Sequence, residues 1–591
     1  MRTTAIILIL ALSLLILTLS GGGLFTIPLI LVALALSVTA GLVTLRTTRP
    51  DPGQDASRVP PYLEITAALI LVFILLTALP LPPALDSLAG SLRHQQNQAV
   101  VTAIHQAAQC GAPPLMEEPW FSLSRNRAGT LRFFLLLAGA LSAGLLTATL
   151  PSKGKLVFLG FLTLLGTGVG VAGYLGQWVI PQGDTLWWFI PIPHAPTAPV
   201  GCFLNRNHFA GFVAMLCPVA LALTAHAITT RRWLAAILSL TLTGLMAGVV
   251  FLSLSRGAML AMLGGLVVTS LLIAFRHRLL WGLLLLGLIA AGSVGVITQS
   301  PAIRERLDGI HKPAELASVN SRLNEWRESL RVWPHYPLIG AGANALRMVY
   351  PQYRQTSVGA RLLHAENEYI QLLVECGLVG VALALGGLWT IRQRIRQAPA
   401  LPTVIVTAVT GALSVTALHC LFDFPAHLPL YALVLGGLAG VLLTPAAGDT
   451  RATRWAALSP ALIAIIGATL IAWNGPADIR TLDDPNFLYK AKNRDLHRAL
   501  IWAPTSGAWL YLGRSLMKEG TATGNGPLCQ QAERVITRAA TLDPQNYRLW
   551  YEVGEVRLSL NDRPGATEAF QRTQALRSWM APPDTLRSPS P

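Results

Sequence analysis

LEITAALILVFILLTAL, at residues 63–79, is one of many long apolar runs in this chain. AIILILALSLLILTL (5–19) and GLLLLGLIAAGSVGVI (282–297) have the same character. Each run is long enough, or nearly so, to cross about 30 Å of hydrocarbon as a helix. Because such runs recur along most of the chain, a single buried core helix does not explain them. They predict an all-α, polytopic membrane protein.

The composition agrees with a membrane location. The chain has 591 residues, of which 52% are hydrophobic and 13% are charged, whereas soluble domains carry about 25% charged residues. The net charge of +16 fits the positive bias of cytoplasmic membrane loops. The sequence has no Walker A loop, no zinc-type cysteine spacing and no interleaved basic and aromatic run. We therefore expect no nucleic-acid partner and no cofactor.

The basic residues of the short loops predict the topology. Alternate short loops carry at least two Lys or Arg residues, whereas the short turns near 21–23 and 423–426 carry none. This pattern places the N-terminus in the cytoplasm, with the first span as a signal anchor, and the C-terminus outside. We expect about thirteen spans, near 4–20, 24–45, 62–80, 131–150, 155–176, 208–228, 233–254, 257–275, 279–298, 368–391, 401–421, 427–445 and 455–473.

Three regions follow from this topology. Residues 1–473 form the transmembrane domain, and within it residues 299–367 form a large outer loop that is helical in part, near 322–333. Residues 474–591 form an outer tail, in which 542–576 resemble a tetratricopeptide repeat and 503–517 an interrupted copy. We interpret the tail as a small α-helical repeat domain that docks on the membrane domain or on a protein partner. The alternative is that its helices only pack on one another.

Polar residues gather at three places on the predicted outer face. Charged groups near a membrane are costly and often functional. The alternatives are structural, such as an arginine that snorkels to lipid headgroups or a histidine that caps a helix. The segments are FLNRNHFAGFVAMLCP (203–218), with Asn205, Arg206, Asn207 and His208; LSLSRGAMLAML (252–263), with Arg256 in a tight turn; and RLLHAENEYIQLLVECGLVG (361–380), with His364, Glu366, Asn367, Glu368, Gln371 and a deeper Glu375.

These segments form an ordered set of motifs. The set consists of NRNHFAGF (205–212), SRGA (255–258), Arg322 with Trp326 and PLIGAGANAL (337–346), and HAENEYIQLLVECGLVG (364–380), followed by HCLFDFPAHLPLYALVLGGL (419–438). Over roughly 200–445 the chain resembles the O-antigen ligase and polymerase-related family. The resemblance implies metal-independent transfer of a glycan from undecaprenyl diphosphate on the periplasmic face of a bacterial inner membrane. The expected partners are this lipid-linked donor, a lipid or glycan acceptor, and membrane lipids.

The resemblance also suggests roles for single residues. Arginine binds phosphate oxygens bidentately and stays charged, so Arg206 and Arg256 are assigned to the diphosphate, with Arg322 as a third. His364 is the expected base for the acceptor hydroxyl, with Glu366 as the alternative. Many family members read His-x-His-Asn here, and Glu366 replaces the second histidine, which leaves that choice open. The expected substrate-positioning residues are Asn205, Asn207, His208 and Asn367.

His419, Asp423 and His427 have the i, i+4, i+8 spacing of some metal sites. Pro425 interrupts any helix between them, so a structural or substrate-lining role is favoured and no metal is assigned.

The acceptor decides the exact activity. A lipid A–core acceptor would make the protein a ligase, a second lipid-linked glycan a polymerase, and a protein side chain an oligosaccharyltransferase. A transporter or flippase is the rival from another class, although the spans show no internal repeat. A third alternative is that the membrane domain is only a structural scaffold that carries the repeat domain of the tail.

Overall fold

Helices account for nearly all of the secondary structure in the described part of the chain. The structure, a computed structural model, describes residues 2–22, 25–47, 60–82, 90–114, 119–179, 185–187, 190–191, 200–276, 287, 295, 298–299, 313–355, 363–397, 401–445, 451–473, 488 and 493–577. Two short antiparallel ribbons join β1 (Pro80–Leu81) to β2 (Phe121–Ser122) and β3 (Thr185–Leu186) to β4 (Ile190–Pro191).

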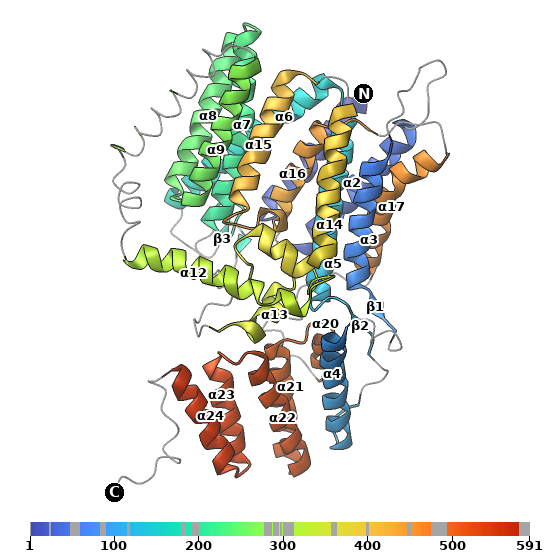
Figure 1. The fold of residues 1–591 in the computed structure, drawn as a ribbon, viewed down its shortest axis with the longest axis vertical. Helices are drawn as coiled ribbons and strands as arrows, with labels where there is room; N and C mark the ends of the chain where they lie inside the picture. Colours follow the sequence, from blue (N-terminus) through green and yellow to red (C-terminus); the bar gives the residue numbers. More distant parts are fainter. Residues whose placement is uncertain are drawn as a thin grey trace.

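The apolar runs form a bundle of helices, drawn in the upper part of Figure 1. Among the described residues, eight helices are long and apolar enough to cross a membrane, and four shorter apolar helices accompany them. The all-α polytopic fold is thus confirmed. The expected span at 279–298 lies almost entirely outside the described residues, so the count of thirteen stays a prediction. The long helices are α2 (Thr26–Thr47), α5 (Arg127–Ala148), α6 (Ser152–Val179), α7 (Arg206–Thr229), α8 (Trp233–Leu252), α9 (Arg256–Arg276), α14 (Glu368–Gln397) and α17 (Arg451–Trp473), and the shorter ones are α1 (Arg2–Leu19), α3 (Tyr62–Ala78), α15 (Thr403–His419) and α16 (Pro429–Val441).

Helix α7 is the most enclosed of the long helices, and it packs against α6, α8, α9 and α15. Small residues such as Ala210 and Ala214 are completely buried along it and let neighbouring helices approach closely. Gly211 is the extreme case, because a Cβ there would lie 2.2 Å from Nε2 of His419 on α15. This close approach brings the first turns of α7 next to the last turn of α15.

The loops predicted to be cytoplasmic lie together at one end of the bundle. Lys155, near the start of α6, donates to the carbonyl of Leu443 at 2.8 Å. Arg394, in the last turns of α14, is buried and donates to the carbonyls of Thr444 and Pro60, both at 2.8 Å. These bonds join loops that are far apart in the sequence.

The loops predicted to lie outside share the opposite end. The backbone N–H of Leu430, at the start of α16, donates to the carbonyl of Gly22 at 3.2 Å. The indole of Trp187 donates to the carbonyl of Thr18 at 2.6 Å. The two ends therefore carry the two groups of loops that the basic residues distinguish.

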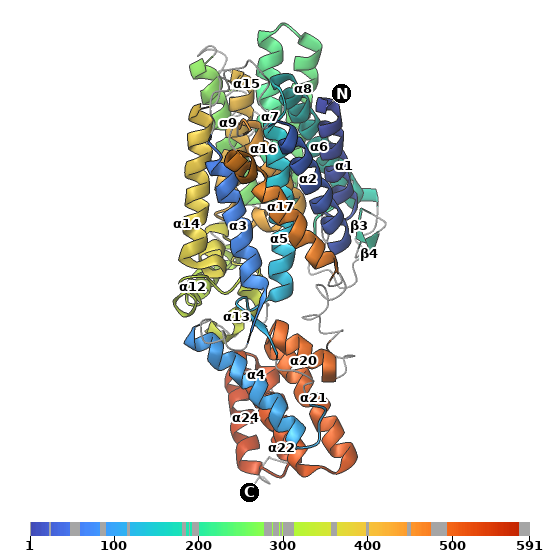
Figure 2. The same ribbon diagram turned by 90° about the vertical axis from the view of Figure 1, so that its right-hand side faces the viewer.

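A layer of helices below the bundle connects it to the tail (Figures 1 and 2). The layer contains α12 (Pro313–Leu330), the 3-10 helix η3 (Trp333–His335) and α13 (Leu346–Tyr353), all from the large loop. Helix α4 (Ser91–Gln109) comes from the loop between α3 and α5. The tail consists of α20 (Asn493–Trp502), α21 (Ser506–Thr523), α22 (Gly526–Leu542), α23 (Tyr547–Ser559) and α24 (Arg563–Leu576).

The tail docks on helix α4. Val100 and Ile104 of α4 are completely buried in one apolar core with Leu528 and Ala532 of α22. At the edge of this core, Gln531 donates to the carbonyl of Ala103 at 3.2 Å. In the tail, α21 packs on α22 and α23 packs on α24. The tetratricopeptide identity of these helix pairs stays a prediction.

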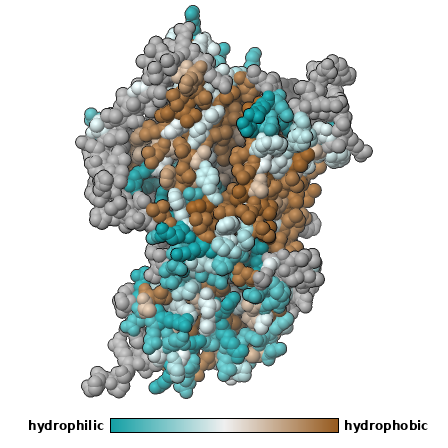
Figure 3. Space-filling model, in the orientation of Figure 1, coloured by the Kyte–Doolittle hydropathy of each residue, from teal (hydrophilic) through white to brown (hydrophobic). Residues whose placement is uncertain are grey.

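Surface character divides along the long axis of the molecule. Figure 3 shows hydrophobic residues gathered over the helices of the bundle and hydrophilic residues over the tail and α4. A hydrocarbon layer would favour the first surface and water the second. The layer with α12 and α13 lies at the boundary between them.

Candidate functional site

The site begins where the large loop enters α14. Asn367 caps that helix: its Oδ1 accepts from the backbone N–H groups of Tyr369 at 3.0 Å and Ile370 at 3.1 Å. Its Nδ2 donates to the carbonyl of Leu421 at 3.2 Å. These contacts tie the loop to the turn after α15. A direct contact between Asn367 and a substrate stays a prediction.

Helix α14 is broken three turns after its start, and the large loop fits into the break. Gly377 has φ 63° and ψ −165°, which is outside the helical region. The N–H of Ala341 donates to the carbonyl of Val374 at 3.0 Å, and the N–H of Val379 to the carbonyl of Leu338 at 2.9 Å. A Cβ at Gly377 would lie 2.4 Å from the oxygen of Leu338. The GAGAN segment (residues 340–344) is thus held against the break in α14.

Glu375 fixes the end of that segment. Its carboxylate is 2% exposed and accepts from the backbone N–H groups of Asn344 at 2.6 Å and Leu346 at 3.0 Å. The second bond satisfies an N–H at the start of α13, where a carboxylate also interacts favourably with the helix dipole. Gln371 donates to the same carboxylate at 3.2 Å.

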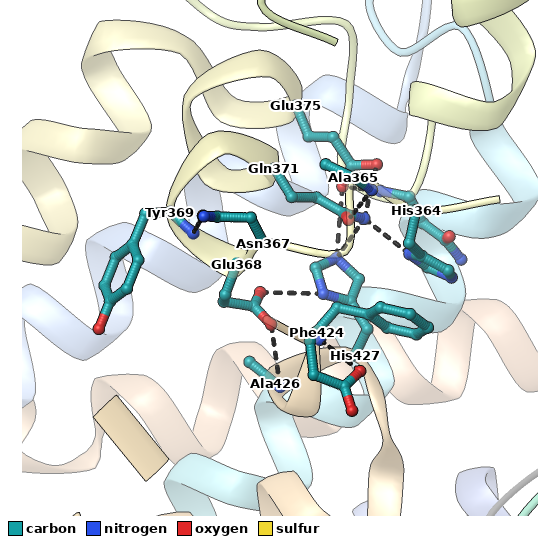
Figure 4. Close-up of polar contacts among 12 residues, drawn as sticks. His364, Ala365, Asn367, Glu368, Tyr369, Gln371, Glu375, Phe424, Ala426 and His427 are labelled. Carbon is teal, nitrogen blue, oxygen red and sulfur yellow. Dashed lines mark hydrogen bonds and ion pairs between the residues drawn. The ribbon is translucent and has the colours of Figure 1, made fainter. Parts of the chain in front are cut away.

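His427 lies between two carboxylates, as Figure 4 shows. Its Nδ1 is 3.0 Å from Glu368 Oε1 and its Nε2 is 3.3 Å from Glu375 Oε2. Burial alone would lower the pKa of His427, but the charges and hydrogen bonds of Glu368 and Glu375 raise it to about 10. His427 is therefore an imidazolium at neutral pH, with both ring nitrogens donating.

His364 has the opposite protonation state to His427, because its ring is neutral. Gln371 Oε1 accepts from the N–H of Ala365 at 3.0 Å, which orients the amide so that Nε2 faces His364 Nδ1 at 2.7 Å. Because an amide NH₂ donates, His364 Nδ1 accepts, and the neutral ring carries its proton on Nε2. Burial, followed by the charges of His427 and Arg347, holds the pKa of His364 well below its usual value. The ring stacks on Phe424, with centroids 3.8 Å apart.

Asp423 anchors the histidines of two helices. Its carboxylate is 3.2 Å from Nε2 of His208 on α7 and 3.0 Å from Nε2 of His419 on α15. Burial would raise the pKa of Asp423, but these two histidines hold it well below its usual range. Asp423 therefore remains negatively charged at any physiological pH.

Glu366 is the titratable carboxyl of the cluster. It has a left-handed backbone, with φ 50°, and its side chain is half-buried. Burial and the nearby charge of Asp423 raise the pKa of Glu366 to about 7, while His208 and Arg322 act in the other direction. The structure thus brings His364, Glu366, His208 and Arg322 into one region. Their catalytic and substrate-binding roles stay predictions.

The other predicted residues lie at the starts of helices at this same end of the bundle. Asn205 caps α7 by accepting from the N–H of Asn207 at 2.8 Å, and Arg206 is the first residue of α7. Arg256 is the first residue of α9, and a Cβ on the next residue, Gly257, would be 3.4 Å from Phe422. Helix starts attract anions. A diphosphate clamp by Arg206 and Arg256 stays a prediction.

Sequence reasoning missed the roles of Gln371, Asp423 and His427. The signal in the sequence was the i, i+4, i+8 spacing of His419, Asp423 and His427, for which a structural or substrate-lining role was favoured. In the structure, Nε2 of His419 is 3.0 Å from Oδ2 of Asp423. Within the described residues, no group of three or more His, Cys, Asp or Glu side chains is arranged to hold a metal ion. The partners of His427, Glu368 and Glu375, come from another helix, so its own neighbours in the sequence gave no hint.

Comparison with known proteins places part of this site in a family. The family model described as O-antigen ligase matches residues 241–385, which span α8 to the first half of α14 and include Arg256, Arg322, His364 and Glu366. The chain matches no curated protein. The chain is therefore a multispanning membrane protein of the all-α class in its described residues, and its residues 241–385 match the O-antigen ligase family.

Proposed function

We propose that this protein is a membrane glycosyltransferase that moves a glycan from undecaprenyl diphosphate to a lipid or glycan acceptor at the periplasmic face of the inner membrane. The observation that carries the proposal is the half-buried carboxyl group of Glu366, two residues after His364 in the loop, whose pKa is raised to about 7 by burial and Asp423 and lowered in part by His208 and Arg322. A general base works best when its pKa is near the working pH. The O-antigen ligase domain supports the same class of reaction.

We assign different tasks to the two candidate bases, His364 and Glu366. His364 Nδ1 already accepts a hydrogen bond from Gln371, so the remaining ring position is a donor, Nε2–H. Glu366 is then the base that takes the acceptor hydroxyl proton. His364 donates a hydrogen bond to an oxygen of the acceptor or of the diphosphate. This division is our proposal for the choice between His364 and Glu366 that the sequence left open.

The reaction is a direct displacement with inversion at the anomeric carbon. The acceptor oxygen forms the new bond to that carbon as its proton passes to Glu366. The bond from the carbon to the diphosphate oxygen breaks, and undecaprenyl diphosphate leaves with its electron pair. Arg322, which acts electrostatically on Glu366, is placed to meet the developing negative charge, and Arg206 and Arg256 complete the clamp.

The test is transfer by purified protein from a defined undecaprenyl-diphosphate glycan, with mass spectrometry of the product. We expect Glu366→Gln to reduce kcat roughly 100-fold or more, because it removes the base with little change in shape. Arg322→Gln should also cause a large loss. Its matched control is Arg327→Gln on the same helix, since Arg327 is exposed and donates to Asn324, one turn earlier, at 3.1 Å.

Full transfer by Glu366→Gln and by Arg322→Gln protein would show that the catalytic assignment is wrong. The mass of the product identifies the acceptor class. Addition to lipid A–core indicates a ligase, a lengthened lipid-linked glycan a polymerase, and a modified polypeptide an oligosaccharyltransferase.

A further inference from the structure

Helix α13 lies between the bundle and the tail (Figures 1 and 2). It has 8 residues, which corresponds to about 12 Å of length. As described above, its first turn is held by Glu375 of α14. Its other contacts reach α12, the loop before α14 and the tail. This helix therefore touches every part of the chain that surrounds the catalytic cluster on the side of the tail.

An ion pair joins the end of α13 to the tail. Arg354, directly after α13, donates from Nε and Nη2 to Oδ1 of Asp543 at 3.0 and 2.7 Å. Asp543 follows α22, and its Oδ2 accepts from the side chain of Asn546, which caps α23, at 3.1 Å. The Arg354 and Asp543 side chains are only 12% and 10% exposed. A buried, hydrogen-bonded charge pair keeps its partners together, because separation leaves each charge uncompensated.

A second carboxylate joins α13 to α12. Glu328 of α12 is 3% exposed, and it accepts from the hydroxyl of Tyr350 and, at 3.0 Å, from the N–H of Gln355. Burial and Glu328 raise the pKa of Tyr350, so its hydroxyl keeps the proton that it donates. Arg322, whose charge acts on Glu366, lies earlier on α12. The position of this arginine therefore depends on where α13 holds α12.

An apolar core joins α13 to the candidate bases. Val349 of α13 is buried in one cluster with Val374 of α14 and with Ala365. Ala365 is completely buried and lies between His364 and Glu366 in the sequence. Close-packed side chains leave little free space, so a displacement of one is transmitted to its neighbours. A movement of α13 would thus displace both candidate bases.

Other contacts hold the tail on α4. The side chain of Asn525 donates to the carbonyl of Cys110 at 2.6 Å, and Gln531 donates to the carbonyl of Ala103 at 3.2 Å. Both residues belong to the cap and the first half of α22, beside the apolar core that α22 shares with α4. Asp543, at the opposite end of α22, contacts the large loop instead. Its ion pair is therefore a separate link from the tail to the catalytic region.

We propose that Asp543 and Arg354 are positioning residues for glycan transfer, because their ion pair lets the docked tail hold α13 in place. Helix α13 in turn holds Arg322, His364 and Glu366 in the arrangement that the reaction needs. The inference rests on the proposed function for the reaction that is affected. A misplacement of reacting groups by about 1 Å can reduce a rate about 100-fold. The tail is thus a working part of the transferase, although it does not touch the substrate.

Transfer by the purified full-length protein in nanodiscs tests the role of the ion pair. Asp543→Asn and Arg354→Gln should each reduce kcat roughly tenfold or more. The double variant should lose little more than either single variant, because both substitutions break the same contact. The matched control is Glu533→Gln, which breaks an ion pair with Arg557, at 2.7 Å, inside the tail. We expect it to keep the wild-type kcat.

Three results of this assay would overturn the proposal. The first is a wild-type kcat in Asp543→Asn and Arg354→Gln protein. The second is a double variant in which the two losses multiply, because the residues would then act independently. The third is an equal loss in Glu533→Gln protein, which would mean that any weakening of the tail reduces transfer.

Displacement of α12 also predicts a shift in the pH profile of Asp543→Asn protein. Glu366 faces Arg322 and Glu325 of α12, His208 of α7 and Asp423. Of the two α12 charges, Arg322 has the larger effect and lowers the pKa of Glu366, whereas Glu325 raises it. If α12 moves away, this pKa rises and the midpoint of kcat moves to higher pH. A pair that only stabilises the fold would lower the rate without moving the midpoint, and that result would contradict the positioning role.

Hydrogen exchange, measured by mass spectrometry, does not depend on the reaction. In Asp543→Asn protein we expect faster exchange in α13, in residues 322–330 of α12 and in residues 363–371, with wild-type exchange in α21 and α22. Faster exchange in the tail alone would overturn the proposal, because the pair would then stabilise only the tail. The expected exchange in a protein whose wild type shows no transfer would count against the proposed function alone. The expected exchange with a normal kcat would count against the positioning role alone.

Discussion

At the residue scale, the cluster separates the protonation states of groups that lie close together. His427 is bracketed by two carboxylates and is cationic, whereas His364 accepts a hydrogen bond from an amide and is neutral. Asp423 is held ionised by His208 and His419. Glu366 is the member whose charge changes near neutral pH. Acid and base roles follow from environments that differ in this way.

The titration of Glu366 predicts the pH dependence of transfer. A carboxyl group acts as a base only when it is deprotonated, so the rate should rise with pH through the pKa of about 7. Below that pKa the rate should fall about tenfold per pH unit. Initial rates between pH 5 and pH 9, with the donor saturating, measure this profile. A rate that does not change over this range would exclude Glu366 as the base.

Variants of the neighbouring charges sharpen the same prediction. Asp423 raises the pKa of Glu366 and Arg322 lowers it. Asp423→Asn should therefore move the midpoint to lower pH, and Arg322→Gln should move it to higher pH. A merely structural role for either residue would reduce the rate without moving the midpoint.

At the scale of single elements, the break in α14 connects the large loop to the bundle. Gly377→Ala would place a methyl group on a left-handed residue and within 2.4 Å of the oxygen of Leu338. We expect a loss of about 1–3 kcal/mol in the free energy of unfolding from backbone strain, together with a large loss of transfer, because the GAGAN segment must move. Thermal unfolding in detergent and the transfer assay measure the two effects.

Gly386 offers the control for that substitution. It lies later in the same helix, and a Cβ there would meet no other atom within 4 Å. Gly386→Ala should leave transfer unchanged and stabilise the helix by about 0.5–1 kcal/mol. If Gly377→Ala and Gly386→Ala behave alike, the break has no special part in holding the loop.

The same elements show how far sequence reasoning reaches. Apolar runs predict helices because membrane spans must satisfy their backbone internally. His364 and Glu366 were identified as polar residues just before such a run, and Arg322 was identified through the family resemblance. The break at Gly377 was missed, because VECGLVG continues the apolar pattern and a single glycine does not identify its φ angle. Helix α4 was also missed: its mixed polar sequence becomes interpretable only once α22 lies against it.

At the scale of the whole molecule, the site, the large loop, α4 and the tail share one end. The basic loops around Lys155 and Arg394 share the other end (Figure 1). This arrangement allows one membrane orientation to determine the compartment of every functional part. The bias of basic residues towards the cytoplasm predicts that the site faces the periplasm.

Cysteine labelling tests that orientation with one residue from each end. Leu330, the last residue of α12, is 39% exposed, and Arg396, in the last turn of α14, is exposed as well. Among the native cysteines, only Cys110 is not buried, so the Cys110→Ser substitution removes the native cysteine that the reagent could label most readily. We expect a membrane-impermeant maleimide to label Leu330→Cys in intact spheroplasts, and to label Arg396→Cys only after permeabilisation. The reverse pattern would place the proposed catalytic cluster in the cytoplasm. It would contradict the predicted orientation and also the proposed function, because glycan transfer at the periplasmic face requires the cluster to lie on that side.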